Sequence, residues 1–86
     1  MITIKLNTVK SLSSANEFYQ LFGECPIFFG ENANLKLSGE VTFGKHIEIH
    51  GDCEVGSGSK IDTGVVLSHS TIQEHNDIRN YSIIKD

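Results

Sequence analysis

Four histidines are the side chains of this sequence best suited to acid–base or metal chemistry: His46, His50, His69 and His75. His46 and His50 lie next to Glu48 and Asp52, and a general base needs such a carboxylate for orientation as well as a cleft for its substrate. A spacing of four residues places two histidines on one face of a helix, whereas this stretch alternates like a strand and does not favour a metal site. We therefore interpret His46 and His50 as solvated corner residues, and we place His69 and His75 in an irregular C-terminal segment.

The other reactive residue types also favour structural roles. Four serines lack the G-x-S-x-G pattern of a nucleophile elbow and are interpreted as turn residues: Ser57, Ser59, Ser68 and Ser70. The glycines of the GSGSK segment lack the strand–loop–helix context of a phosphate loop. Cys25 and Cys53 show no zinc-site spacing, which predicts reduced, structural thiols. We predict no catalytic, cofactor-binding or metal-binding residue in this chain.

The secondary structure that positions these residues is indicated most clearly by the stretch 35–55. Its apolar residues occur in pairs two apart, and the pairs recur every six residues: Leu35 and Leu37, Val41 and Phe43, Ile47 and Ile49, Cys53 and Val55. This period is too short for two antiparallel strands with their turn, and it does not match a helix. It is typical of a parallel β-helix, in which three short strands close one coil in about eighteen residues. A β-meander would also alternate, but the unbroken phase over four units favours the β-helix.

The pattern is interrupted after Val55, where we interpret GSGSK as an insertion of about two residues that loops out at a corner. With this loop set aside, stacking predicts three contacts between coils: Leu35 beneath Cys53, Val41 beneath Ile61 and Ile47 beneath Leu67. The residues predicted to point inward are Leu35, Val41, Ile47, Cys53, Ile61 and Leu67. Four isoleucines in the tail indicate a third, incomplete coil: Ile72, Ile78, Ile83 and Ile84.

Residues 1–34 are expected to form an extended segment, a helix and a capping link, followed by the β-helix at 35–86, all within one small domain. The extended segment is 2–6, and spacings of three and four predict a helix face: Val9, Leu12, Ala15, Phe18, Tyr19 and Phe22. We expect the link 23–34 to be loop-like, because Pro26 disfavours a helix there.

The sequence allows two positions for the N-terminus of this helix. Ser14 with Glu17 forms a capping box that would start it at Ala15, whereas Thr8 would cap an earlier start. Gly23 suits the left-handed position that ends a helix. Together with the bulky run Ile27 to Phe29, the helix is expected to cover one end of the β-helix.

Composition restricts the possible partners. The 86 residues carry a net charge of -4, and the seven Lys and Arg residues are scattered singly, so no basic surface for nucleic acid is expected. The longest apolar run, 26–29, is too short to cross a membrane, and no signal-peptide pattern opens the sequence. We expect a cytoplasmic protein.

The run LKLSGEVTFGKHIEIHGDCEV resembles the C-terminal left-handed β-helix of the eukaryotic-type UTP-glucose-1-phosphate uridylyltransferases (UDP-glucose pyrophosphorylases), where a segment like L-x-V-S-G-D-V-x-F-G-x-x-V-x-L-x-G is typical. The matching residues are Leu35, Leu37, Ser38, Gly39, Val41, Phe43, Gly44, Ile47, Ile49 and Gly51, with Glu40 as the acidic residue. The resemblance weakens after Leu67. The family usually has I-D-I-P-P-G near its end, whereas Ile61-Asp62-Thr63-Gly64 lacks the prolines.

The resemblance implies a parent enzyme that uses magnesium to transfer the uridylyl group of UTP to glucose 1-phosphate, with release of pyrophosphate. Its nucleotide site lies in a preceding α/β domain, and none of the family's catalytic residues falls on this chain. The chain thus looks like a detached C-terminal module, without catalytic activity or a cofactor of its own.

Three function hypotheses follow. The first is a β-helix module for oligomerisation or regulation, the second a small hexapeptide-repeat acyltransferase with a histidine base between coils, and the third a stand-alone structural protein. For the first, we expect a homo-oligomer that forms at the end of the β-helix that the helix does not cover, where apolar surface and strand edges remain. Its interface would be Ile72, Ile78, Ile83 and Ile84.

Overall fold

The computed structural model describes residues 2–85, which form three four-stranded sheets around one core and a single α-helix, α1 (Ala15–Phe22). Sheet A contains β1 (Ile2–Lys5), β5 (Glu40–Phe43), β8 (Lys60–Ile61) and β11 (Asp77–Ile78). Sheet B contains β2 (Lys10–Leu12), β4 (Asn34–Leu37), β7 (Asp52–Val55) and β10 (Thr71–Ile72). Sheet C contains β3 (Ile27–Phe29), β6 (Ile47–His50), β9 (Val66–Ser68) and β12 (Ile83–Lys85).

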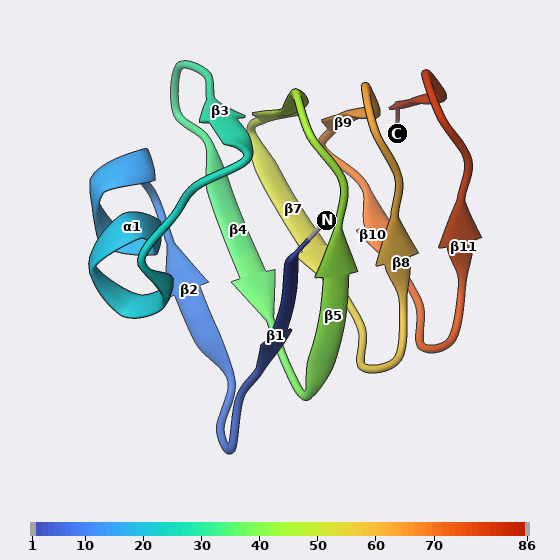
Figure 1. The fold of residues 1–86 in the computed structure, drawn as a ribbon. Coiled ribbons are helices and arrows are strands. Elements are labelled where there is room, and N and C mark those ends of the chain that lie inside the picture. The colour runs from blue at the N-terminus through green and yellow to red at the C-terminus, as the bar shows by residue number, and fades with distance from the viewer. Residues whose placement is uncertain (1, 86) are drawn as a thin grey trace.

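From β4 onward the chain winds through sheets B, A and C in turn. Coil 1 comprises β4, β5 and β6, coil 2 comprises β7, β8 and β9, and coil 3 comprises β10, β11 and β12; equivalent strands pair in parallel. In Figure 1 the chain rises in β5, crosses to the far side and descends in β7, and each new coil lies further right, so the β-helix is left-handed. The predicted fold class is confirmed.

The predicted inward residues are all buried: Leu35, Val41, Ile47, Cys53, Ile61 and Leu67. The polar residues in the middle of the pairs, Lys36, Glu48 and Glu54, are exposed. This in–out alternation is what a strand with one face on a core requires.

The predicted register is correct for one of its three contacts. Leu35 pairs with Cys53, as expected, but Ile61 pairs with Phe43 and Leu67 with Ile49. GSGSK is therefore not an insertion, since the spacing of eighteen residues continues through it. The pattern appeared to break because the inward position before Lys60 is taken by a serine, Ser59, which is only 2% exposed.

Coil 3 follows coil 2 at a spacing of seventeen residues: Val55 pairs with Ile72, Ile61 with Ile78 and Leu67 with Ile84. All three sides of this coil are present, although β10 and β11 contain two residues each. The tail therefore forms a whole coil with short strands, where an incomplete one was expected.

Residues 2–29 add a further layer to the N-terminal end of the stack. β1 and β2 pair antiparallel with β5 and β4, and β3 pairs parallel with β6. Ile27 is buried in this layer opposite Ile47, so the link predicted to be loop-like is in part a strand. The reason is that Ile27 and Phe29 continue the inward positions of sheet C.

Helix α1 begins at the later of the two predicted starts. The Ser14 hydroxyl accepts a hydrogen bond from the backbone N–H of Glu17, and the Glu17 carboxylate accepts one from the N–H of Ser13. Gly23 ends the helix in the predicted left-handed conformation, with φ of 81°. Two residues assigned to the helix face lie outside it: Leu12 is buried at the end of β2, and Val9 is 55% exposed.

The helix covers the N-terminal end of the core through Phe18. Its side chain is fully buried, and its ring centroid lies 4.8 Å from that of Phe22 and 6.0 Å from that of Phe43. Figure 1 shows α1 at the left end of the stack, with coil 3 at the opposite end.

Candidate functional site

Three of the four histidines are left-handed corner residues. His46, His69 and His75 have φ of 57°, 47° and 59°, a conformation that histidine tolerates better than most residues with a Cβ. Each is equivalent to a left-handed glycine in a neighbouring coil: Gly64, Gly51 and Gly58, respectively. A Cβ at Gly51 or Gly58 would overlap the ring of His69 or His75, so these glycines give the rings room. The interpretation of His46 as a corner residue is confirmed, and His69 and His75 lie at regular corners where an irregular segment was expected.

His50, also interpreted as a corner residue, is instead the last residue of β6, and it is the histidine with a carboxylate partner. Its Nε2 lies 3.3 Å from Oε1 of Glu48, which is a neighbour on the outward face of β6. Both side chains are about half exposed, so this pair resembles a surface ion pair more than a base held in a cleft. Within residues 2–85, no three His, Cys, Asp or Glu side chains lie together as metal ligands would.

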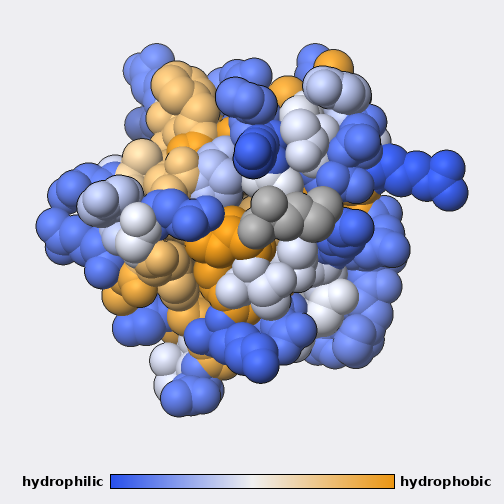
Figure 2. Space-filling model, viewed as in Figure 1, coloured by the Kyte–Doolittle hydropathy of each residue, from blue (hydrophilic) through white to orange (hydrophobic). Residues whose placement is uncertain are grey.

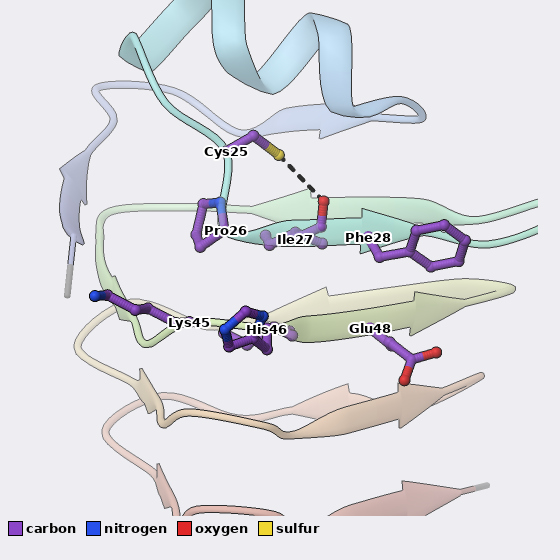
Figure 3. A pocket seen from close by; sticks show the side chains of 8 residues that line it. Cys25, Pro26, Ile27, Phe28, Lys45, His46 and Glu48 are labelled. Atoms are coloured by element: carbon purple, nitrogen blue, oxygen red, sulfur yellow. Dashed lines mark hydrogen bonds between the residues drawn. The ribbon is translucent and has the colours of Figure 1, made fainter.

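A shallow groove of about 700 Å³ runs along sheet C between β3 and the corner before β6. Figure 3 shows Pro26 and Phe28 on one side and Lys45, His46 and Glu48 on the other. The groove thus combines two apolar side chains with charges of both signs.

Cys25 also lines this groove, next to Pro26. Burial raises the pKa of its thiol, and a backbone hydrogen bond at Ile27 opposes this in part. The thiol itself donates to the carbonyl oxygen of Ile27, 3.2 Å away. The thiolate is the nucleophilic form, so a raised pKa makes Cys25 less reactive at neutral pH. Both cysteines are free, as predicted, and Cys53 is buried in the core.

Two of the serines interpreted as turn residues point into the β-helix instead. The Ser59 hydroxyl donates to the carbonyl oxygen of Gln73 at 2.8 Å, and the Ser70 hydroxyl donates to that of Ser68 at 2.7 Å. These bonds satisfy the hydroxyl groups and allow a polar side chain inside the coil. Their positions in the repeat could have identified them as inward residues. Ser59 follows Val41 by eighteen residues, and Ser70 follows Cys53 by seventeen.

The four tail isoleucines do not share one surface. Ile72, Ile78 and Ile84 occupy inward positions, and burial decreases along the chain: Ile72 is buried, whereas Ile78 and Ile84 are half-buried. Ile83 points outward from sheet C and is 64% exposed. The inward residues that Ile78 and Ile84 pair with, Ile61 and Leu67, are fully buried.

The C-terminal edges of the three sheets lie together at this end. Within the described residues, β10, β11 and β12 each pair with one neighbour only, which leaves one edge of each strand free. The free edges surround the half-buried Ile78 and Ile84. Strand edges next to apolar side chains are the features that favour pairing with another chain.

The three flat faces of the β-helix also differ. The central outward residues are polar on sheet A (Thr3, Thr42, Lys60 and Asp77) and on sheet B (Ser11, Lys36, Glu54 and Thr71). On sheet C they are Phe28, Glu48, Val66 and Ile83, three of them apolar. Figure 2 agrees for the near face, where sheet A of coils 2 and 3 presents mainly hydrophilic atoms.

No helix in the described part of the chain is long and apolar enough to cross a membrane. Comparisons of the chain with protein-family models, with curated proteins and with solved structures found no match.

Proposed function

We propose that this chain is a non-catalytic assembly module that self-associates through the C-terminal end of its β-helix. The supporting observation is the difference in burial between equivalent isoleucines and leucines. Inward side chains of coils 1 and 2 are buried, whereas Ile78 and Ile84 of coil 3 are only partly buried and lie beside free strand edges. A second copy on this end would bury both the side chains and the edges.

The role is the one that the resemblance to the C-terminal β-helix of the uridylyltransferases implies. The residues that carry this resemblance have structural roles here: Val41 and Phe43 fill the core, Gly39 forms a left-handed corner, and a Cβ at Gly44 would overlap the backbone of Thr63. The motif thus supports the architecture of a β-helix. We further propose that the chain serves a catalytic uridylyltransferase domain as its assembly module. Saturable binding of UTP to the isolated chain in calorimetry, with release of pyrophosphate, would overturn the non-catalytic part of the proposal.

The assembly is tested by light scattering over a wide range of concentrations. We expect a mass that rises from about 9.5 kDa towards a closed dimer, because a two-fold contact buries both ends at once. A mass of 9.5 kDa at every concentration would reject the proposal.

A double substitution, Ile83→Lys with Ile84→Lys, should keep the chain monomeric while coil 1 stays folded. The matched control is Tyr19→Lys with Leu21→Lys, which places the same two charges at exposed residues of α1, far from coil 3. An equal loss of the dimer in both variants would show that general surface charge, and not the C-terminal end, controls association.

A further inference from the structure

We infer that two copies join through β12, in an antiparallel pairing centred on Ile83, so that sheet C runs continuously through both. This inference rests on the proposed self-association and specifies which of the three free edges makes the contact. Three observations carry it: the direction of the backbone groups, the outward side chains of the three edge strands, and the residues that flank Ile83.

The backbone of β12 presents its free groups at Ile83. The N–H of Val66 donates to the carbonyl oxygen of Ser82 at 2.9 Å, so the backbone groups of Ser82 face β9. Successive residues of a strand direct these groups to opposite sides, and the N–H and C=O of Ile83 therefore face the free edge. In a two-fold antiparallel pair, Ile83 and its symmetry mate would exchange two hydrogen bonds.

The outward side chains favour β12 over the other two edges. A two-fold pairing of β11 would place Asp77 opposite its own copy, and like charges directly opposite each other destabilise a strand pair. A pairing of β10 would bring together two Thr71 side chains, which bury little apolar area. A pairing of β12 brings together two Ile83 side chains, and β12 has three residues where β10 and β11 have two.

The residues that flank Ile83 are compatible with this register. The strand pair is limited to residues 82–84, because Tyr81 is a left-handed corner residue with φ of 59° whose N–H donates to the carbonyl oxygen of Thr63 in coil 2. No two like charges of β12 meet across the pair.

The inward positions are compatible with the same register. Ile84 falls opposite Ser82 of the second copy, and both residues continue the inward rows of sheet C. The half-buried Ile84 would thus be covered from the partner's side. The outward apolar residues Val66 and Ile83 would form one stripe with those of the second copy.

The register is tested by disulfide cross-linking of Ile83→Cys in a Cys25→Ser, Cys53→Ala background that circular dichroism shows to be folded. Residues that form a hydrogen-bonded antiparallel pair have Cα atoms about 5.5 Å apart, a distance that suits a disulfide. We expect mild oxidation to give a covalent dimer in non-reducing electrophoresis. The matched control is Thr71→Cys, at the central outward position of the neighbouring edge β10, which should remain mainly monomeric.

A second measurement uses the dissociation constant of the dimer. Ile83→Lys should raise it by about tenfold or more, because two ammonium groups would meet on the axis, whereas Thr71→Lys should change it little. If the chain dimerises but Thr71→Cys cross-links as well as Ile83→Cys, or Ile83→Lys leaves the dissociation constant unchanged, the β12 pairing is overturned and the proposed function stands. If the unsubstituted chain is monomeric at every concentration, both fail.

Discussion

The two ends of this β-helix are closed in different ways. At the N-terminal end, β1, β2 and β3 add a layer of strands, and α1 covers the core with the fully buried Phe18. At the C-terminal end, coil 3 has short strands with free edges, and its inward side chains are partly exposed. Because burial of apolar area is the main source of stability, the free energy of local opening should decrease from coil 1 to coil 3.

The two inward side chains of each strand, which stack on their equivalents from coil to coil in two rows, explain this decrease in stability. The second inward position of every pair stays large and apolar, as in Leu67 and Ile84, whereas the first becomes polar at Ser59 and Ser70. Coil 3 therefore keeps one apolar row and has hydrogen-bonded side chains beside it. A coil built in this way depends on its neighbours more than coil 1 does.

The largest effect is expected for a charge in coil 1. A chain of 86 residues has a free energy of unfolding of about 4 to 13 kcal/mol. Ile47→Asp would lose a buried side chain worth about 2 to 5 kcal/mol and would bury a carboxylate without a partner as well. We expect the variant to be unfolded in circular dichroism.

The matched control for this prediction is Ile83→Asp, which lies on the same sheet but points outward. This variant should keep the spectrum of a folded chain. A native-like spectrum for Ile47→Asp would contradict the inward register on which the comparison of the two ends depends.

The next effect concerns the N-terminal cap. Phe18→Ala should lower the free energy of unfolding by about 3 to 5 kcal/mol, because it leaves a cavity against Phe22 and Phe43. Urea unfolding followed by circular dichroism measures this loss. Tyr19→Ala, at an exposed position of the same helix, should change the midpoint little, and equal losses would show that Phe18 has no special role in closing this end.

Much of the fold could be predicted because the repeat is strongest where packing is strongest. Both apolar rows are intact from Leu35 to Val55, and there the predicted strands and inward residues are correct. The prediction of the register failed at Ser59, since hydrophobic periodicity cannot identify an inward residue that is satisfied by hydrogen bonds. The parallel strand β3 was also missed, because three residues are too few for a periodic signal and Pro26 suggested a loop.

The features of the candidate site were predictable only in part. The tail isoleucines marked the right end of the molecule, but a difference of one residue decides whether a side chain points into the coil or outward. Ile84 and Ile83 are therefore on opposite sides of β12, which a pattern with loose spacing could not separate. The left-handed corners of His69 and His75 depend on stacking against glycines of the preceding coil, which only the coil register reveals.

The smallest effect on stability is expected for Ser59→Ala, which removes one side-chain link between coil 2 and coil 3. Ser59 donates to the carbonyl oxygen of Gln73 at 2.8 Å, and its oxygen accepts from the N–H of Asn76 at 3.3 Å. In Ser59→Ala the Asn76 N–H loses this acceptor, while Gln73 keeps the hydrogen bond from the Asn76 side chain at 3.2 Å. The expected loss is therefore near the lower limit of about 1 to 3 kcal/mol for leaving a polar group unpaired.

Hydrogen exchange can locate this loss. In Ser59→Ala, amides of coil 3 such as Asn76 should exchange faster, whereas amides of coil 1 such as Ile47, whose N–H donates to the carbonyl oxygen of Pro26, should keep their protection. Ser57→Ala is the matched control, since the Ser57 hydroxyl accepts from the N–H of Glu40 in coil 1 at 3.4 Å and thus contacts the preceding coil, away from coil 3. An equal rise in exchange in all three coils of Ser59→Ala would mean that the chain opens as one unit, and the C-terminal coil would then have no stability of its own to lose.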